Sequence, residues 1–294
     1  EKCGFALAGQ TDRLVPADRK MYAIRDATAT IEYIPLIVAS IMSKKIAEGL
    51  NALIIDVKAG SGAFMQQLCD AENLAAELVK TGEKFKIKSR ALISDMNRPL
   101  GKFIGNSVEV YEAVKILKGE KDRLTERTRE LSLALTAHLI EIAGLAENYH
   151  AAMEICVNAL DSGKAFELFL ENVKLQGGEP QCVEKPETLL PENSLVIENE
   201  APGFVTEINA RKIGEAVCRM GGGRVKAEDR IDHSIGIELI ADINDRVEKG
   251  DPLCRIFYSN RRPNEKDTED IRNAFIIEEK AAESTDSLIM KVIS

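Results

Sequence analysis

The sequence is poor in aromatic residues and in histidine, and it lacks any closely spaced pair of cysteines. Aromatic side chains make up 5% of the 294 residues, tryptophan is absent and three residues are histidine. Because none of the six cysteines forms a C-x-x-C pair, a zinc site and a disulfide framework are both disfavoured, and reduced thiols in the cytoplasm are predicted. No stretch approaches the ~18 uncharged apolar residues that a membrane span needs, so no membrane segment is expected.

Basic residues are fewer than acidic ones, 39 against 48, which gives a formal net charge of -9. Nucleic acids and anionic membranes attract positively charged surfaces, so neither is an expected partner. The hydrophobic fraction of 45% is ample for buried cores. A chain of this length corresponds to roughly two domains of ~150 residues.

The first residue is Glu1 where an initiator methionine would stand, and no signal-peptide pattern follows it. The residues after it resemble the interior of a domain that has already begun. We therefore expect an N-terminal portion of the protein to precede this chain.

Apolar residues recur with helical and strand periods along the chain. A buried helix is predicted after Pro35, which suits the first turn of a helix, and the next helix is expected to stop at a left-handed Gly82. Strand, turn, helix and strand in this order indicate a right-handed βαβ unit. The predicted helices cover residues 36–49, 64–80, 108–117, 123–142, 165–176 and 212–219, and the predicted strands cover residues 52–57, 90–94, 194–197 and 203–208.

Ser40 and Lys44 lie four residues apart on one face of the first helix, which is otherwise mostly apolar. Polar groups on such a face are costly unless a polar partner meets them, and Arg25 is a candidate member of the same cluster. Alternatively, the lysine reaches solvent and the serine bonds back to a helix carbonyl. The spacing alone favours this second interpretation.

Several long blocks resemble, in family order, the thymidine and pyrimidine-nucleoside phosphorylases. The resemblance extends over nearly the whole chain. Its blocks are GQT (9–11), PAD (16–18), YAIRDATAT (22–30), IPLI (34–37), SIMSKK (40–45), DVKAGSGAFM (56–65), PLG (99–101) and GN (105–106).

This resemblance implies reversible phosphorolysis of a pyrimidine nucleoside, thymidine or uridine, with phosphate as co-substrate. Negative charge grows on the base as the glycosidic bond breaks, so fixed cations beside its oxygens stabilise the transition state. In the family, the residues that match Arg25, Ser40 and Lys44 hold the base through its oxygens and N3, and the two cations are the catalytic candidates. The positions that match the apolar lining of the base pocket are Ile31, Ile37 and Phe64.

The resemblance also implies an α/β fold, α+β overall, in a homodimeric cytoplasmic enzyme. A partial helical domain would precede a central α/β domain whose sheet contains the βαβ unit, and a hammerhead-like or barrel-sandwich domain would follow. The Gly- and Pro-rich change in composition after residue 176 predicts a linker between the last two. The expected segments are 1–49 (helical and base-binding), 50–176 (α/β), 177–193 (linker) and 194–294 (C-terminal).

A potassium site is a further implication of the resemblance. The bacterial pyrimidine-nucleoside members hold potassium at positions that match Leu100, Phe103 and Glu112. The first two would supply main-chain oxygens and the third a carboxylate, which are the hard ligands that an alkali ion needs. Otherwise, Glu112 is simply an exposed carboxylate on a helix, and both interpretations remain open.

Other polar features are expected to be structural. Gly221 to Gly223 with Arg224 is predicted to be a turn and not a phosphate cradle. His150 is expected in a polar connector, and the family's catalytic histidine matches none of the three histidines. Tyr33 departs from the Ser or Thr that is usual in the family, which bears on nucleoside preference.

The family binds phosphate through a Lys-His-Ser segment and a glycine-rich loop that would precede Glu1, so this chain by itself is expected to be inactive. Three hypotheses remain. The chain is the larger part of a pyrimidine-nucleoside phosphorylase, or a related phosphorylase for another base, or an inactive relative that acts by binding or dimerisation.

Overall fold

The computed structural model describes residues 2–7, 15–18, 21, 33–224, 229–282 and 287–294. Contacts along the chain divide it into two compact units. The first unit consists of Glu1–Asp95, Leu131–Asn158 and Ser287–Ser294, and the second of Met96–Glu130 and Ala159–Asp286. Among the described residues, no helix is both long and apolar enough to span a membrane.

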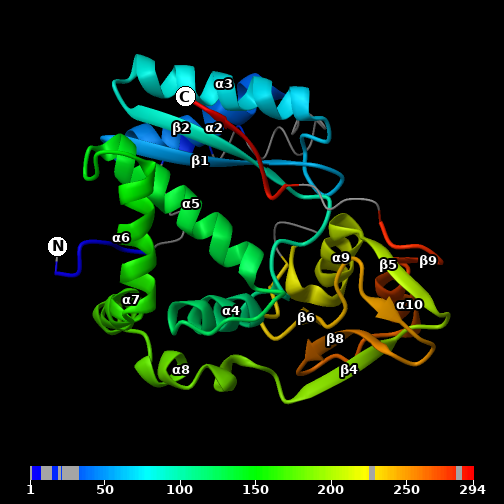
Figure 1. The fold of residues 1–294 in the computed structure, drawn as a ribbon. Helices are drawn as coiled ribbons and strands as arrows, with labels where there is room; N and C mark the ends of the chain where they lie inside the picture. The colour runs from blue at the N-terminus through cyan, green and yellow to red at the C-terminus, as the bar shows by residue number, and fades with distance from the viewer. Residues whose placement is uncertain (1, 8–14, 19–20, 22–32, 225–228, 283–286) are drawn as a thin grey trace. The chain divides into compact units, whose positions relative to one another are not determined.

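The first unit contains a three-stranded sheet in the order β1-β2-β10 (Figure 1). Its strands are β1 (Ala52–Ala59), β2 (Lys88–Asp95) and β10 (Ile289–Ile293). β1 and β2 are parallel and are connected through α3 (Leu68–Lys84), which confirms the predicted strand–helix–strand order. β10 joins β2 from the other side in the antiparallel direction. The end of the chain therefore completes a sheet that begins near residue 52.

Two helices pack on one face of this sheet. α2 (Ile34–Ala47) begins with Pro35 in its first turn, as predicted, and shares an apolar core with α3 and the strands. Met42, Leu78 and Ile93 are fully buried members of this core. Burying such side chains contributes about 1.5–3 kcal/mol each, so the core holds α2 in place against the sheet.

The predicted stop at Gly82 is wrong. α3 continues through this residue to Lys84, and Lys86 takes the left-handed conformation instead, with a φ of 62°. A Cβ on Gly82 would lie 2.0 Å from the Ser89 hydroxyl oxygen of β2. The glycine therefore permits close packing of the helix on the strand.

α5 (Glu126–Ala143) approaches the other face of the sheet, where Glu141 ion-pairs with Arg90 of β2 (Figure 1). α6 (Tyr149–Asp161) packs on α5 through a small core that includes Ala137 and Ala152. The polar connector predicted around His150 is wrong, because this residue lies in the first turn of α6.

The second unit contains two antiparallel sheets around one apolar core. The four-stranded sheet has the order β3-β6-β8-β4, and the three-stranded sheet the order β7-β5-β9. The strands are β3 (Phe103–Gly105), β4 (Asn193–Glu198), β5 (Gly203–Ile208), β6 (Gly236–Leu239), β7 (Arg246–Val247), β8 (Pro252–Tyr258) and β9 (Phe275–Glu278). The helices are α4 (Ser107–Leu117), α7 (Lys164–Leu175), α8 (Pro180–Glu184), η1 (Pro186–Leu189), α9 (Ala210–Val217), η2 (Cys218–Gly222) and α10 (Glu265–Arg272).

The mixture of helices with parallel and antiparallel strands confirms the predicted α/β class. β10, which comes from the last of the four predicted segments, pairs with β2 in the first unit. The stretch predicted to be a linker contains α8 and η1, in which Val183 and Pro186 are buried. The four-part division itself stays a prediction.

Candidate functional site

The Lys44 side chain is held by two oxygen acceptors. Its Nζ donates to Oγ of Ser40, one helical turn earlier, at 2.9 Å and to Oδ2 of Asp18 at 2.7 Å. Ser40 and Asp18 are both buried. The lysine of α2 is thus in a polar cluster and does not simply extend into solvent. Among the described residues, two of its three N–H bonds have acceptors, so the third is offered to a ligand oxygen.

Asp18 was not recognised from the sequence as a member of this cluster. It belongs to the PAD block, but the 26 residues that separate it from Lys44 carry no periodic signal that joins the two. A buried carboxylate requires a charged or hydrogen-bonding partner, and Lys44 is one such partner of Asp18. The salt bridge fixes where the ammonium points.

Of the remaining predicted base-binding residues, the structure describes Ile37 and Phe64. Arg25 and Ile31 lie outside the described residues. Ile37 is partly buried against the apolar core beneath α2. Phe64 is 62% exposed, on the loop that follows β1. The structure therefore brings Ser40 and Lys44 together, and the lining of the pocket stays a prediction.

The loop that carries Phe64 is folded back on the end of β1. Gly60 has a φ of 128°, a conformation that glycine adopts readily, and its amide donates to the Met65 carbonyl at 3.1 Å. Ala59 and Met65 form an isolated parallel bridge. The Gly-Ser-Gly turn thus closes tightly and leaves the phenylalanine ring accessible to a ligand.

Glu112 of α4 is not an exposed helix carboxylate, so that alternative is wrong. The residue is 4% exposed. Its carboxylate accepts hydrogen bonds from the Phe103 amide at 2.7 Å, from the Thr128 hydroxyl at 2.7 Å and from the Lys102 amide. Burial raises the pKa of Glu112, and these neutral donors offset that effect only in part.

The backbone next to Glu112 offers one oxygen of the kind that an alkali ion needs. The amide of Leu239 donates to the carbonyl of Lys102, and Phe103 is paired with Glu238 of β6. Hydrogen-bonded and non-hydrogen-bonded pairs alternate along an antiparallel ladder. Because the pair of Lys102 and Leu239 is hydrogen-bonded, the next pair, Phe103 and Glu238, is not. The N–H and C=O of Phe103 therefore both point away from β6, toward the side where its amide meets Glu112. A main-chain oxygen and a buried carboxylate therefore lie on one side of β3. In the described part of the chain, no group of three His, Cys, Asp or Glu side chains offers a transition-metal site.

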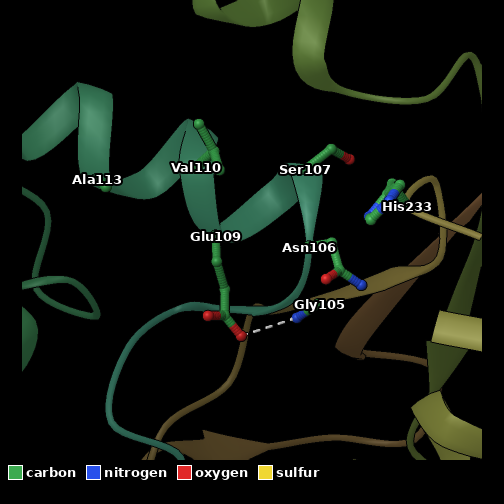
Figure 2. Close-up of a pocket in the computed structure, with 7 residues that line it drawn as sticks. All are labelled: Gly105, Asn106, Ser107, Glu109, Val110, Ala113 and His233. Carbon is green, nitrogen blue, oxygen red and sulfur yellow. Dashed lines mark hydrogen bonds between the residues drawn. The ribbon is translucent and has the colours of Figure 1, made fainter. Parts of the chain in front are cut away.

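An open cavity of about 530 Å³ lies at the start of α4. Figure 2 shows the Glu109 side chain turned back toward the Gly105 amide, to which it is hydrogen-bonded at 3.0 Å, and His233 facing the start of the helix. Burial raises the pKa of Glu109. Asn106 donates to the Gly222 carbonyl at 2.7 Å and so ties α4 to the glycine-rich segment, in which Gly221 has a φ of 106°. The structure thus gives that segment an anchoring contact.

Comparisons with known proteins assign the class. Residues 1–166 match a family described as "Glycosyl transferase family, a/b domain", and residues 204–278 match one described as "Pyrimidine nucleoside phosphorylase C-terminal domain".

Individual relatives of this chain are of one particular kind of protein. The pyrimidine-nucleoside phosphorylase of Staphylococcus aureus strain bovine RF122 / ET3-1 is 42% identical over 292 residues, which are 98% of this chain and 66% of the relative. That of strain MSSA476 is 45% identical over 260 residues, 87% of this chain and 59% of the relative. The chain belongs to the pyrimidine-nucleoside phosphorylase family of glycosyl transferases. It spans slightly less than two thirds of the length of these relatives.

Proposed function

We propose that the residues of this chain act in a pyrimidine-nucleoside phosphorylase. This enzyme converts thymidine or uridine and phosphate to the free base and pentose 1-phosphate. The observation that carries the proposal is the identity of 42% with such an enzyme over 98% of the chain. The polar cluster of Lys44, Ser40 and Asp18 agrees with it, because it holds a cation where the family resemblance places base binding.

In the proposed reaction a phosphate oxygen forms a bond to the anomeric carbon of the pentose while the carbon–nitrogen bond to the base breaks. The bonding electrons leave with the base, and negative charge spreads to its carbonyl oxygens. The third N–H of Lys44 donates to one of these oxygens, and Ser40 contributes to binding at the same edge. Arg25 supplies a second cation. These contacts strengthen as charge develops, so they lower the barrier and not merely the dissociation constant.

The face of the pyrimidine ring requires an apolar surface. Phe64, which is exposed on its loop, is proposed to provide it. Ile31 and Ile37 are proposed to complete the lining. Aromatic side chains bury large areas, so closing Phe64 over the ring would exclude water from the charged contacts.

Potassium is the proposed cofactor. Glu112 and the main-chain oxygens of Phe103 and Leu100 would hold it. The bound ion would supply positive charge beside a carboxylate that is now buried among neutral donors. It would thereby stabilise the junction of β3 and α4 without taking part in bond breaking. A homodimer and a cytoplasmic location complete the proposal.

The test is an ultraviolet assay that follows the cleavage of thymidine and uridine. The sample is the protein expressed from its complete gene. Base release that requires phosphate, and that fails when sulfate replaces phosphate at equal ionic strength, supports the proposal. Release without phosphate would identify a hydrolase and overturn it. Coding sequence before Glu1 for a Lys-His-Ser segment followed by a glycine-rich loop would support catalysis over a role in binding alone.

A further inference from the structure

Asp56, Lys58 and Ser94 form a polar trio at the end of the parallel strands β1 and β2. Asp56 and Lys58 are two residues apart on β1 and so share a face of the sheet. Ser94 of β2 is the direct partner of Lys58 in the strand register. Carboxyl ends of parallel strands are where ligands bind in open α/β sheets. The trio therefore lies where this architecture commonly places a ligand.

The three side chains are joined to one another by hydrogen bonds. Lys58 Nζ lies 2.6 Å from Asp56 Oδ2 and donates to Ser94 Oγ at 2.9 Å. The Ser94 hydroxyl in turn donates to Asp56 Oδ1 at 2.5 Å. Each group fixes the other two, and one N–H of the ammonium is left over within the described part of the chain.

Burial is unequal within the trio. Ser94 is 0% exposed, whereas the side chains of Lys58 and Asp56 are 29% and 23% exposed. On the opposite face of the same strands, Val57 and Ile93 are buried in the apolar core. The serine is thus a fixed internal support, and the two charged groups remain accessible to a ligand.

We infer that Asp56 and Lys58 form a subsite for hydroxyl groups of the pentose and that Ser94 positions them. A hydroxyl both donates and accepts, and the pair offers an ammonium N–H beside a carboxylate oxygen. The carboxylate would repel a phosphate group, and the net charge of the trio is zero, so phosphate is the poorer ligand. This inference rests on the proposed function and adds the sugar to it.

The position of the trio along the chain supports this assignment. Lys58 is followed by the Gly60 turn, and the loop returns at Met65 to bridge Ala59. That loop carries Phe64, the proposed contact of the base. In a nucleoside the sugar is attached to the base, so one strand end would supply groups for both halves of the substrate.

The experiment compares hydroxyl-deleted substrates in the phosphate-dependent assay. Lys58→Met and Asp56→Asn are measured with uridine and with its 2′-deoxy, 3′-deoxy and 5′-deoxy analogues. Each variant is expected to lose about 10- to 100-fold in kcat/KM on uridine, the effect of one hydrogen bond to a charged group. On the analogue that lacks the contacted hydroxyl, the variant and the unaltered protein should agree within about twofold, since the interaction is already absent.

Lys45→Met is the matched control, because Lys45 pairs with Glu48 on the exposed side of α2 and should leave all four substrates unaffected. Equal losses on all four substrates would overturn the inference and show that the trio only supports the fold, as would unchanged kinetics. Asparagine has nearly the shape of aspartate, so Asp56→Asn decides the matter if Lys58→Met does not fold. Failure of the unaltered protein to cleave any of the four nucleosides would count against the proposed function itself.

Discussion

The ammonium of Lys44 donates to the hydroxyl of Ser40 at 2.9 Å, across one turn of α2. The side chain is also held by the buried carboxylate of Asp18, at 2.7 Å. A lysine normally has several freely rotating bonds, and fixing it costs conformational entropy. Here that cost is met during folding, so the cation is already oriented when a ligand arrives.

Replacing Lys44 by methionine should lower kcat/KM for the pyrimidine nucleoside by ~10²-fold or more, the size expected for the loss of one contact that stabilises developing charge. Methionine keeps much of the side-chain length and removes the charge. The measurement is steady-state phosphorolysis of thymidine and uridine. Lys45→Met, one residue along the same helix, is the control and should retain activity. Equal rates for Lys44→Met and the unaltered protein would refute the assigned role.

Asp18→Asn should lower kcat/KM by ~10-fold, because the neutral amide holds the ammonium less firmly and the lysine then samples other orientations. If Asp18 acts only through Lys44, the effect should vanish when Lys44 is already methionine. A double-mutant cycle of the two changes measures this coupling. Additive losses from the two substitutions would instead show that the carboxylate acts independently of the lysine.

The shared helix face of Ser40 and Lys44 could be predicted from the sequence, and the contact of Lys44 with Asp18 could not, for a physical reason. Ser40 and Lys44 repeat at helical spacing, so their shared face follows from the period of an α-helix. The contact from Asp18 and the pairing of β10 with β2 join distant parts of the chain, and no local pattern specifies them.

At Gly82 and Glu112 the structure also differs from what the sequence suggests. Gly82 has the residue type of a helix stop, yet it lies inside α3 because Ser89 of β2 leaves no room for a Cβ. The sequence leaves Glu112 open to interpretation as a solvated carboxylate, and its burial is explained by hydrogen bonds from Lys102, Phe103 and Thr128. In both cases a neighbouring strand decides the role, and the helix sequence alone does not contain it.

A potassium ion beside Glu112 predicts a stabilisation that is specific to this cation. Potassium chloride should raise the melting temperature of the protein more than sodium chloride at equal ionic strength, since a ligand that binds only the folded state stabilises it. Glu112→Gln should abolish the difference, because the amide keeps the shape of the side chain but not its charge. The measurement is thermal unfolding followed by circular dichroism.

Glu109→Gln is the matched control for this experiment, since Glu109 is on the same helix and bonds to the Gly105 amide. It should retain the response to potassium. The assignment is wrong if Glu112→Gln responds to potassium as strongly as the unaltered protein does.

The contact between Arg90 and His138 predicts that stability falls in mild acid. Arg90 Nη1 lies 2.7 Å from His138 Nδ1, which must be unprotonated to accept this hydrogen bond, and the ring lies against Tyr149 at 4.4 Å between centroids. Burial, and then the charge of Arg90, lower the pKa of His138 from 6.5, although Glu141 opposes the shift. The unfolded chain therefore binds this proton first as the pH falls. The stabilisation that the neutral His138 ring contributes is complete above about pH 6.5. It is lost as the pH falls through the lowered pKa of this residue.

Urea unfolding at about pH 7.5 and about pH 5.5 measures this effect in the unaltered protein and in His138→Gln. The glutamine variant should lose less unfolding free energy between the two pH values, because it has no proton to take up at this position. Arg90 also lowers the pKa of Glu141, but that carboxyl group releases its contribution below its ordinary value of 4.5, outside the measured interval. If both proteins lose the same unfolding free energy, His138 is protonated without cost and its contact with Arg90 does not stabilise the neutral ring.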